Sequence, residues 1–368
     1  MDKIKETKRC YIDIHVLQTV PPSCVNRDDT GSPKTAIYGG VTRARVSSQA
    51  WKQAVRQYFK TFFDIGTVGF RSKLIVGEVA KTIRELAPDV DCKEAEKKAK
   101  EALEKAGFKL DKKDGSTKVL IYISRDQIKE LANLSVNKEK DEKYKEAIKD
   151  KPAVDMILFG RMLAENPSLN YDASVQVAHA ISTHAVQNEF DYFTAVDDLS
   201  PEDNSGAGHI GTAEFNSATL YRYATINVDE LAKHISETRI TPEEVIEAVK
   251  AFVEAFCKSM PTGKQNSFAN NTFPDMVYIA VRGDQPVSLV GAFEKPIKAT
   301  GEGYVDASER ALIKYAKNAY QLFVSKPELS LGCSLGENGL NDIAELKNIT
   351  DIIQEIGEVV TKRVGDTQ

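Results

Sequence analysis

Positive charge is concentrated in one short stretch of this 368-residue chain, residues 22–60. The stretch contains seven basic residues: Arg27, Lys34, Arg43, Arg45, Lys52, Arg56 and Lys60. It contains only two acidic residues, Asp28 and Asp29, although the whole chain has a formal net charge of -5. Cations gathered locally in an acidic protein are typical of a site that binds phosphate groups. The charge pattern therefore predicts a phosphate-binding unit, and a solvated basic helix surface is the alternative.

The residues that must position these cations predict a strand followed directly by a helix. Apolar and polar residues alternate in residues 41–47 (VTRARVS), so Arg43 and Arg45 are expected on the same face of a strand. Ser47 and Ser48 then stand where the N-cap of a helix is expected. Free backbone N–H groups at a helix start, together with serine hydroxyls, can hold a phosphate of a nucleic-acid backbone.

The predicted helix separates an apolar face from a polar stripe. Apolar side chains recur at helical spacing at Trp51, Ala54, Val55, Tyr58, Phe59 and Phe62. Gln49, Lys52 and Arg56 are spaced i, i+3 and i+7 and so share a different stripe. We therefore expect one face in the core, while the other presents donors and cations to a ligand.

Few residues are arranged for catalysis. The sequence contains no GxxxxGK[ST] or HExxH motif and no Cys–His pair at a suitable spacing. Asp28 and Asp29 are the adjacent carboxylates that would hold Mg²⁺ beside a phosphate in a metal-dependent nuclease. We expect instead that they form a turn or pair with arginine. The sequence therefore predicts no catalytic residue, no metal ligand and no cofactor.

The overall composition describes a globular protein. Hydrophobic residues make up 42% of the chain, and the length favours one large domain with insertions or two domains. No apolar run reaches the roughly 18–20 residues that span a bilayer, and the N-terminal MDKIKETKRC lacks the apolar stretch of a signal peptide. Five scattered cysteines without a CxxC pair argue against a disulfide framework and a zinc ribbon. We therefore expect a cytoplasmic protein without a membrane partner.

Alternation and helical periodicity predict the elements of the first half. Residues 9–17 predict a strand with one available face, on which His15 either contacts a ligand or is half buried. Residues 72–152 are rich in Lys, Glu and Ala at helical spacing and predict a helical insertion, in which SRDQIKELANL begins with a capping serine. Residues 154–165 predict a helix with Arg161 near its polar side.

The second half predicts a hairpin, another strand and two helices. Glycines and small residues at 204–209 predict a flexible tip before a long alternating strand, 215–228. Thr241 is expected to cap a helix that has Pro at its first position. Residues 276–281 predict a strand, and an amphipathic helix is expected from Asn348 onward.

Two histidines lie between these halves. His179 and His184 are five residues apart, which places them on different faces of a helix and is a poor spacing for a shared metal ion. We expect them to pack or to form hydrogen bonds. The predicted order of strand, helix, insertion, strand, helix and strand is compatible with a ferredoxin-like or RRM-type core, and also with other α/β arrangements.

The basic stretch also carries a resemblance to a known family. CVNRDD (24–29) and AIYGGVTRARVSSQAWKQAVR (36–56) resemble the signature of CasC-type backbone subunits of type I-E CRISPR Cascade complexes, in the RAMP superfamily. Further strings agree in the same order: GRMLAE (160–165), VQVAHAISTHAV (175–186), DYFTAVDDL (191–199), HIGTAEFNSATLYRYATIN (209–227), GKQNSFA (263–269) and AFEKPIKA (292–299). The resemblance extends from the N-terminus to about residue 300 and fades at about 85–155 and in the C-terminal tail.

The resemblance implies an α+β fold with three parts. These are an RRM/ferredoxin-like core called the palm, a large helical insertion called the fingers, and a protruding β-hairpin called the thumb. The expected division is 1–62 for the first part of the palm with the RNA-binding loop and helix, 63–184 for the fingers, 185–200 for the palm return, 201–226 for the thumb, and 227–368 for the second part of the palm and the C-terminal helix.

The resemblance also implies a function. Relatives polymerise along a CRISPR guide RNA (crRNA), and the thumb reaches a neighbouring copy and flips out guide nucleotides. The expected partners are the crRNA guide, target DNA in the assembled complex, further copies of the chain and other Cascade subunits. Type I-E relatives carry the NRDD string and are regarded as non-catalytic, whereas type III relatives cut RNA with an aspartate in the equivalent loop. The alternatives are a metal-dependent endoribonuclease that uses Asp28 and Asp29, and a structural oligomer without RNA affinity.

The guide contacts of the family fall on eight residues of this sequence: Arg27, Lys34, Ser47, Gln49, Lys52, Arg56, Thr212 and Lys298. We add Arg45 and Lys264 because they are cations in the basic strand and in a polar loop. The chain departs from its relatives at ENPSLNY (165–171), since relatives can have a methionine shortly after the GRM string, inserted near the kinked guide.

Overall fold

The computed structural model describes residues 9–64, 67–111, 115–163, 166–195 and 209–365. The chain divides into two compact units, each built from three separate segments. The first unit consists of Met1–Val55, Val177–Thr225 and Val253–Ile352, and the second consists of Arg56–Gln176, Ile226–Phe252 and Ile353–Gln368. Segments far apart in the sequence therefore build each unit. The boundaries of the palm, fingers and thumb remain predictions.

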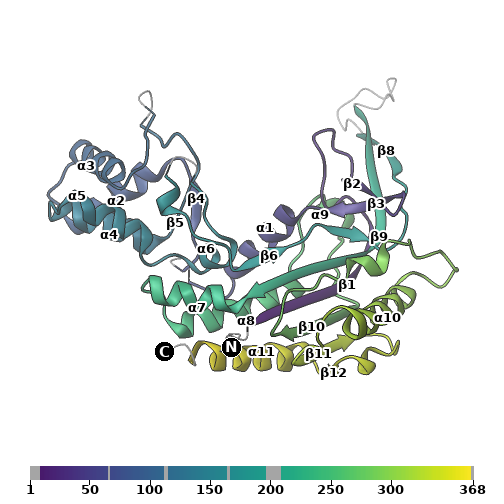
Figure 1. The fold of residues 1–368 in the computed structure, drawn as a ribbon. Coiled ribbons are helices and arrows are strands. Elements are labelled where there is room, and N and C mark those ends of the chain that lie inside the picture. The colour runs from purple at the N-terminus through teal and green to yellow at the C-terminus, as the bar shows by residue number, and fades with distance from the viewer. Residues whose placement is uncertain (1–8, 65–66, 112–114, 164–165, 196–208, 366–368) are drawn as a thin grey trace, which may run out of the picture. The chain divides into compact units, whose positions relative to one another are not determined.

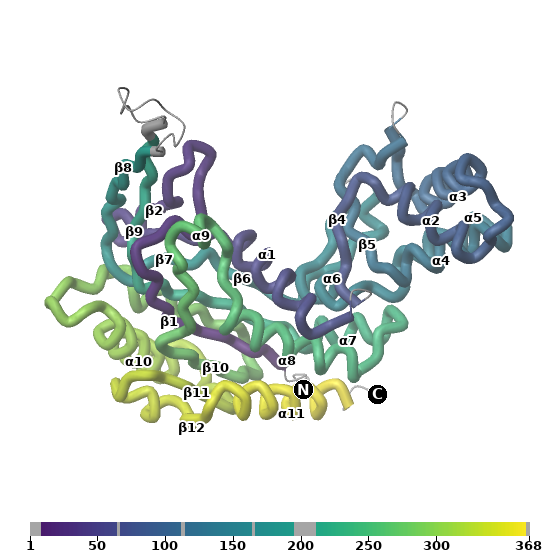
Figure 2. Tube along the Cα trace, turned by 180° about the vertical axis from the view of Figure 1, so that it is seen from behind, coloured from purple at the N-terminus to yellow at the C-terminus, as the bar shows by residue number. Residues whose placement is uncertain are grey.

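Strands and helices are mixed along the chain (Figures 1 and 2), which confirms the predicted α+β class, whereas the RRM-like description of the core stays a prediction. The strands are β1 (Tyr11–Ser23), β2 (Thr35–Tyr38), β3 (Val41–Val46), β4 (Phe70–Ser72), β5 (Ile121–Ile123), β6 (Val175–Val177), β7 (Ala180–Ser182), β8 (Glu189–Ala195), β9 (His209–Asn227), β10 (Met276–Arg282), β11 (Leu329–Ser334) and β12 (Glu345–Leu346). The helices are α1 (Ser48–Phe59), α2 (Ile75–Leu86), α3 (Cys92–Lys105), α4 (Arg125–Val136), α5 (Asp141–Lys149), α6 (Val154–Phe159), α7 (Val228–Glu237), α8 (Pro242–Lys258), α9 (Gln265–Phe268), α10 (Val305–Leu322) and α11 (Ile349–Gly365), with short 3₁₀ turns η1 (Pro167–Leu169), η2 (Val290–Phe293) and η3 (Leu340–Asp342). Across the described ranges, no helix has the length and apolar character needed to cross a membrane.

The larger sheet has ten strands, in the order β12-β11-β10-β1-β9-β7-β3-β2, with β6 and β8 paired to β9 beside this path. β1 pairs antiparallel with β10, from Tyr11 opposite Arg282 to Leu17 opposite Met276. β7 pairs antiparallel with both β3 and β9. The first strand of the chain is therefore central, and the basic strand β3 lies near one edge.

Both faces of β1 are buried, so the prediction of one available face was wrong. Asp13 and His15, on the polar face, are as completely buried as the apolar residues opposite. The His15 ring stacks with Tyr221, Tyr223 and Tyr278 at centroid distances of 5.1–6.2 Å, and its Nδ1 lies 2.9 Å from the Tyr221 hydroxyl. Burial lowers the pKa of His15 to about 3. His15 is therefore a neutral core residue, because tyrosines of β9 and β10 cover its face.

Two helix starts and a hairpin confirm local sequence signals. The Gln127 amide donates to Ser124 Oγ at 3.0 Å, and the Ser124 amide donates to Gln127 Oε1 at 3.1 Å, so a capping box begins α4. A capping box also begins α8: the Glu244 amide donates to Thr241 Oγ1 at 3.2 Å, and the Thr241 amide donates to Glu244 Oε2 at 2.7 Å. β8 and β9 pair antiparallel from Glu189 opposite Phe215 onward, as the predicted hairpin requires. Residues 204–208 of the predicted tip lie outside the described residues.

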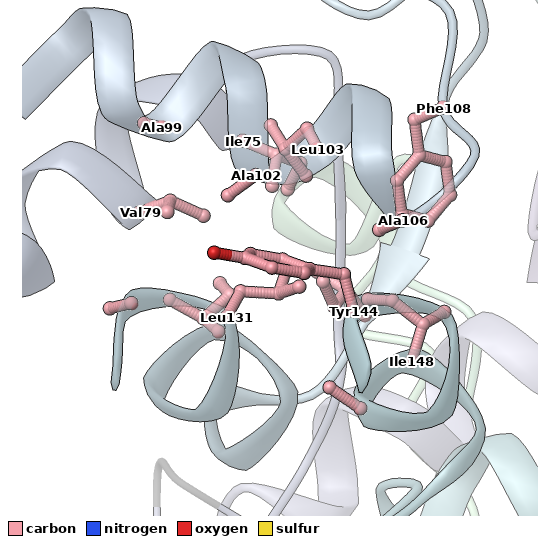
Figure 3. Close-up of a cluster of buried hydrophobic side chains, with 14 of the residues drawn as sticks. Ile75, Val79, Ala99, Ala102, Leu103, Ala106, Phe108, Leu131, Tyr144 and Ile148 are labelled. Atoms are coloured by element: carbon pink, nitrogen blue, oxygen red, sulfur yellow. The ribbon is translucent and has the colours of Figure 1, made fainter. Parts of the chain in front are cut away.

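The helices α2 to α5 of the second unit share one apolar core (Figure 3). α3 contributes Ala95, Ala99 and Ala102, which lie on one helix face and are buried. Tyr144 of α5 is also buried, and its ring lies between Leu131 and the alanine face in Figure 3. Small side chains on α3 leave room for this ring. The predicted helical character of residues 72–152 is confirmed.

The helix predicted at residues 154–165 ends early. α6 stops at Phe159 because Gly160 has φ +76°, a conformation outside the helix. Arg161 is then buried and donates hydrogen bonds to the carbonyl oxygens of Leu169, Tyr122 and Ile148 at 2.7–3.3 Å. The prediction that Arg161 lies near a polar helix side was therefore wrong, since its donors hold the chain that follows α6.

A buried carboxyl in the first unit makes stability depend on pH. Asp13 accepts hydrogen bonds from the Tyr223 hydroxyl at 2.9 Å and from the Val287 amide at 2.8 Å. Burial nevertheless raises the pKa of Asp13 to about 6. The carboxyl therefore binds its proton more tightly in the folded chain than in the unfolded chain, where its pKa is near 4.

We expect Asp13→Asn to remove this dependence. A raised pKa contributes stability that is complete below about pH 4 and is lost as the pH rises through about 6. Relative to Asp13→Asn, the free energy of unfolding of the unmodified chain should therefore fall by about 2–3 kcal/mol between about pH 4 and pH 7. Urea unfolding of both chains across this range measures the difference, and a difference that stays constant with pH would contradict the expectation.

Candidate nucleic-acid interface

The corner between β3 and α1 forms as the sequence predicted. Ala44, Val46 and Trp51 belong to one buried apolar cluster in the first unit. The guanidinium of Arg222, on β9, lies 3.6 Å from the centroid of the Trp51 ring. Cation–π contact and burial together hold the first turn of α1 against the sheet.

Hydrogen bonds from other segments complete the start of α1. The Ala50 amide donates to Ser47 Oγ at 3.3 Å, which confirms Ser47 as the N-cap. The Ser47 amide donates to Asn26 Oδ1 at 2.9 Å, and the Ser48 amide donates to His179 Nδ1 at 3.2 Å. The helix start therefore offers fewer free N–H groups than the sequence predicted.

The loop before β2 places two cations beside this corner. The Lys34 amide donates to the Asn26 carbonyl at 2.9 Å, and the Arg45 amide donates to the Lys34 carbonyl at 2.9 Å. Arg45 Nε also donates to the Thr35 carbonyl at 3.2 Å. A cavity of about 20 Å³, large enough for one water, lies between the loop and β3, and Asn216 shares its lining with these residues. The structure therefore brings Lys34 and Arg45 to the helix start.

A second loop adds Lys264 to the first loop. A side chain at Gly263 would overlap the carbonyl oxygen of Val25, so the two loops are in close contact. Burial raises the pKa of the Cys24 thiol, and the nearby positive charges of Lys264 and Arg27 act in the opposite direction. Lys264 and Arg27 thus lie around Cys24, although they are 237 positions apart in the sequence.

In the same loop, Asp28 forms a turn. One carboxylate oxygen accepts hydrogen bonds from the Thr30 amide at 2.9 Å, the Thr30 hydroxyl at 2.7 Å and the Ser32 amide at 3.1 Å. The bond from the Thr30 hydroxyl is the main cause of a lowered pKa of Asp28. Ser32 Oγ donates to Glu214 at 2.9 Å, and the loop rises beside β8 and β9 in Figures 1 and 2. The expected turn-forming role of Asp28 is confirmed, and no group of three or more potential metal ligands occurs among the described residues.

Arg43 does not belong to the phosphate-binding surface that the sequence predicted. Its side chain is fully buried and donates to the carbonyl oxygens of Ser182 at 2.8 Å, Phe293 at 2.8 Å and Tyr38 at 3.1 Å. Burial lowers its pKa. Arg43 therefore joins three chain segments within the first unit and is not a ligand for RNA.

A comparison with known protein families identifies the family of this chain. The family model of CT1975-like proteins, a family of CRISPR-associated proteins, matches residues 12–359. The chain belongs to the CT1975-like family. No curated protein matches this CT1975-like protein.

Two solved structures are similar to it. A chain of a "CRISPR RNA-guided surveillance complex, pre-nicking" has 34% sequence identity and a TM-score of 0.80, and the match covers 94% of this chain and 100% of that chain. A chain of a "CRISPR RNA-guided surveillance complex" has 29% identity and a TM-score of 0.73, and the match covers 94% of this chain and 99% of that chain. The similarity therefore extends over almost the whole of both chains.

The other predicted contacts of this CT1975-like protein lie on several elements. Gln49 and Thr212 are exposed, Lys52 is partly exposed, and Lys298 is exposed. Thr212 lies on β9 opposite Tyr192 of β8. Among the described residues, no recorded contact joins Thr212 or Lys298 to the helix start. Their part in RNA binding stays a prediction.

Arg56 has partners within the second unit. Its Nε donates to Asp155 Oδ2 at 2.9 Å, and its Nη2 donates to the Gly69 carbonyl at 3.0 Å. The Asp155 side chain is fully buried, and the Arg56 side chain is 14% exposed. The guanidinium also lies 4.8 Å from the centroid of the Tyr122 ring. Arg56 therefore compensates a buried charge, and its predicted contact with RNA would have to be made by the remaining donors.

Sequence reasoning missed several residues, two of them at the helix start and three exposed on other elements. Asn26 and His179 accept the amides at the helix start, and neither was a candidate. Phe190 and Tyr192, on one face of β8, are 61% and 75% exposed. Met162, within the GRM string itself, is 84% exposed. The alternation of aromatic and polar residues in EFDYFTA was the signal for the β8 pair, whereas the two amide acceptors had no local signal.

Arg56→Ala should destabilise the protein. The substitution leaves Asp155 buried without its cation, which costs about 3 kcal/mol of unfolding free energy. Arg45→Ala is the matched control, because Arg45 is partly exposed, with one recorded side-chain bond to a carbonyl, and its loss should cost less than about 1 kcal/mol. Urea unfolding measures both, and equal stabilities of the two variants would contradict a structural role for Arg56.

Proposed function

We propose that the chain is a CasC-type backbone subunit of a type I-E CRISPR surveillance complex, with an RRM-like palm. In this role, copies bind side by side along the spacer part of the crRNA, protect it and present it to target DNA, in contact with the other Cascade subunits. The observation that carries the proposal is the match to a whole chain of an RNA-guided surveillance complex, at 34% identity and with both chains almost fully covered.

The chemistry of the interface supports binding to the RNA backbone. Lys34, Arg45 and Lys264 provide positive charge, and Ser47 and Gln49 provide neutral donors. Groups of this kind hold phosphate and sugar, while base identity is read by donors and acceptors set against base edges. The proposed contact is therefore independent of guide sequence, as a subunit that accepts many spacers requires.

We also propose that the subunit is not an enzyme. The turn around Asp28 supports this, because one oxygen of that carboxylate already accepts three hydrogen bonds. The adjacent carboxylates therefore do not offer Mg²⁺ two free groups, because Asp28 is engaged in the turn.

RNA binding should fall with salt and should be nearly equal for unrelated sequences. Each phosphate neutralised on a single strand contributes about 0.7 to the slope of log K against log salt. Lys34→Gln and Lys264→Gln should each flatten that slope by about 0.7. Ser47→Ala should weaken binding by about threefold to tenfold without changing the slope, because it removes a neutral hydrogen bond.

Filter binding of two unrelated RNAs of equal length, across a salt series, measures these slopes. Ser47 also caps α1, so binding is measured well below the unfolding midpoint of each variant. An affinity gap above about a hundredfold between the RNAs, more than one base contact supplies, would overturn the backbone-contact proposal. Absence of RNA binding would favour a purely structural oligomer. RNA cleavage with Mg²⁺ that is lost in Asp29→Asn would favour the nuclease.

We propose further that the hairpin of β8 and β9 joins neighbouring copies. Phe190 and Tyr192 expose large aromatic surfaces on one face of β8. Exposed apolar patches commonly mark interaction sites, and aromatic residues are enriched at interfaces. A head-to-tail contact, in which this face meets a different surface of the next copy, continues along RNA without closing.

A double variant, Phe190→Ser with Tyr192→Ser, should reduce assembly into multi-copy particles and leave the isolated chain folded. Folding should be unaffected because both side chains are largely exposed in the single chain. Phe323→Ser is the control, since Phe323 is 86% exposed at the end of α10. Particle mass on guide RNA, measured by light scattering, checks the result, and unchanged particles in the double variant would exclude this face from the copy contact.

A further inference from the structure

His179 lies at the proposed RNA-binding corner and is not one of the eight residues that the resemblance implies as guide contacts. Its side chain is exposed, and it directly precedes β7, in a segment that forms strands. The Ser48 amide, at the first position of α1, donates to Nδ1 of the ring at 3.2 Å. A residue 131 positions away in the sequence thus completes the start of α1.

This hydrogen bond determines which nitrogen carries the proton. A backbone amide is always a donor, so Nδ1 must be the bare acceptor nitrogen. In the neutral ring the proton is then on Nε2, which becomes a donor on the opposite side of the imidazole. Burial and the charges of Arg45 and Lys34 lower the pKa of His179, which favours the neutral ring. Within the described part of the chain, Nε2 has no recorded hydrogen-bond partner.

The groups near the His179 ring indicate which kind of ligand its Nε2–H would contact. Arg45 and Lys34 are the two positive charges that act on His179. Gln49 follows Ser48 in α1, and its backbone N–H has no recorded acceptor among the described residues. Two cations, one backbone donor and the imidazole N–H therefore belong to the same corner, and together they would attract a phosphate.

We propose that His179 is a contact residue for the guide, and that its Nε2–H donates a hydrogen bond to an oxygen of the phosphate held by Lys34 and Arg45. The inference rests on the proposed function, since it names one further donor in the same RNA site. His179 has two tasks in this account. Its Nδ1 holds the Ser48 amide, and its Nε2 contacts RNA.

Asparagine and glutamine separate these two tasks. In His179→Asn the side-chain oxygen takes the place of Nδ1, so the Ser48 bond is kept and the distal donor is lost. In His179→Gln the side-chain NH₂ reaches the place of Nε2, so the distal donor is kept and the acceptor for Ser48 is lost. For a contact residue, we expect His179→Asn to lower RNA affinity by about threefold to tenfold and to leave the unfolding midpoint unchanged. We expect His179→Gln to keep most of the RNA affinity.

Filter binding of a single-stranded RNA and of DNA of the same sequence tests the proposal, with thermal unfolding of each variant as the check on folding. The slope of log K against log salt should stay as in the unmodified chain, because the ring is neutral. Unchanged RNA affinity in His179→Asn, with a loss in His179→Gln, would show that the residue only caps the helix and would overturn the inference. A loss confined to RNA would overturn the phosphate assignment in favour of a 2′-hydroxyl.

The same experiment distinguishes the inference from the proposed function. If the unmodified chain binds RNA and His179→Asn binds equally well, the inference is wrong and the proposed function stands. If the unmodified chain binds no RNA, both are wrong.

Discussion

Arg222 is fully buried between the rings of Trp51 and Phe256, at 3.6 and 4.5 Å from their centroids, and much of the candidate interface depends on how that charge is satisfied. Its guanidinium donates to the Gln18 side chain and to the Phe256 carbonyl. Burial lowers the pKa of Arg222 to about 9. A buried cation is tolerated only where neighbouring oxygen atoms and ring faces replace its water. The stack therefore ties β1, β9, α1 and the end of α8 together, and it holds the helix start in place from the core side.

Local signals predicted most elements, because they depend on neighbours in the sequence. The strand at 41–46, the helix from Ser48 and the capped helices α4 and α8 all formed where alternation, spacing and capping residues indicated. Elements that depend on contacts with residues far away in the sequence were harder to predict. α10 was not predicted, and neither were the short strands on either side of His179. Strand β7 is held between β3 and β9, which are far away in the sequence.

The candidate site shows the same limit at the level of single side chains. Periodicity placed Arg43 and Arg45 on one face of β3, and they are alike in the sequence. Arg45 remains partly exposed, while Arg43 is buried because carbonyl oxygens of Ser182 and Phe293, 139 and 250 positions away, lie within reach of its donors. Asn26 and His179 were missed for the same reason. Each acts through a hydrogen bond to a distant segment, and no pattern around either residue indicates it.

Fewer cations of the basic stretch are available to a ligand than the sequence suggests, because two of its arginines are engaged inside the protein. Arg43 and Arg56 each donate to groups inside the protein, so two of the seven cations counted in residues 22–60 do not act mainly on a ligand. The remaining cations are few, and the donors beside them are neutral hydroxyl, amide and imidazole groups. Salt screens only the charged part of such a site, because counterion release scales with the cations that meet phosphate. In the array that we propose, several copies on one guide would multiply these modest contacts, so each copy would need little affinity of its own for the whole array to hold the RNA firmly.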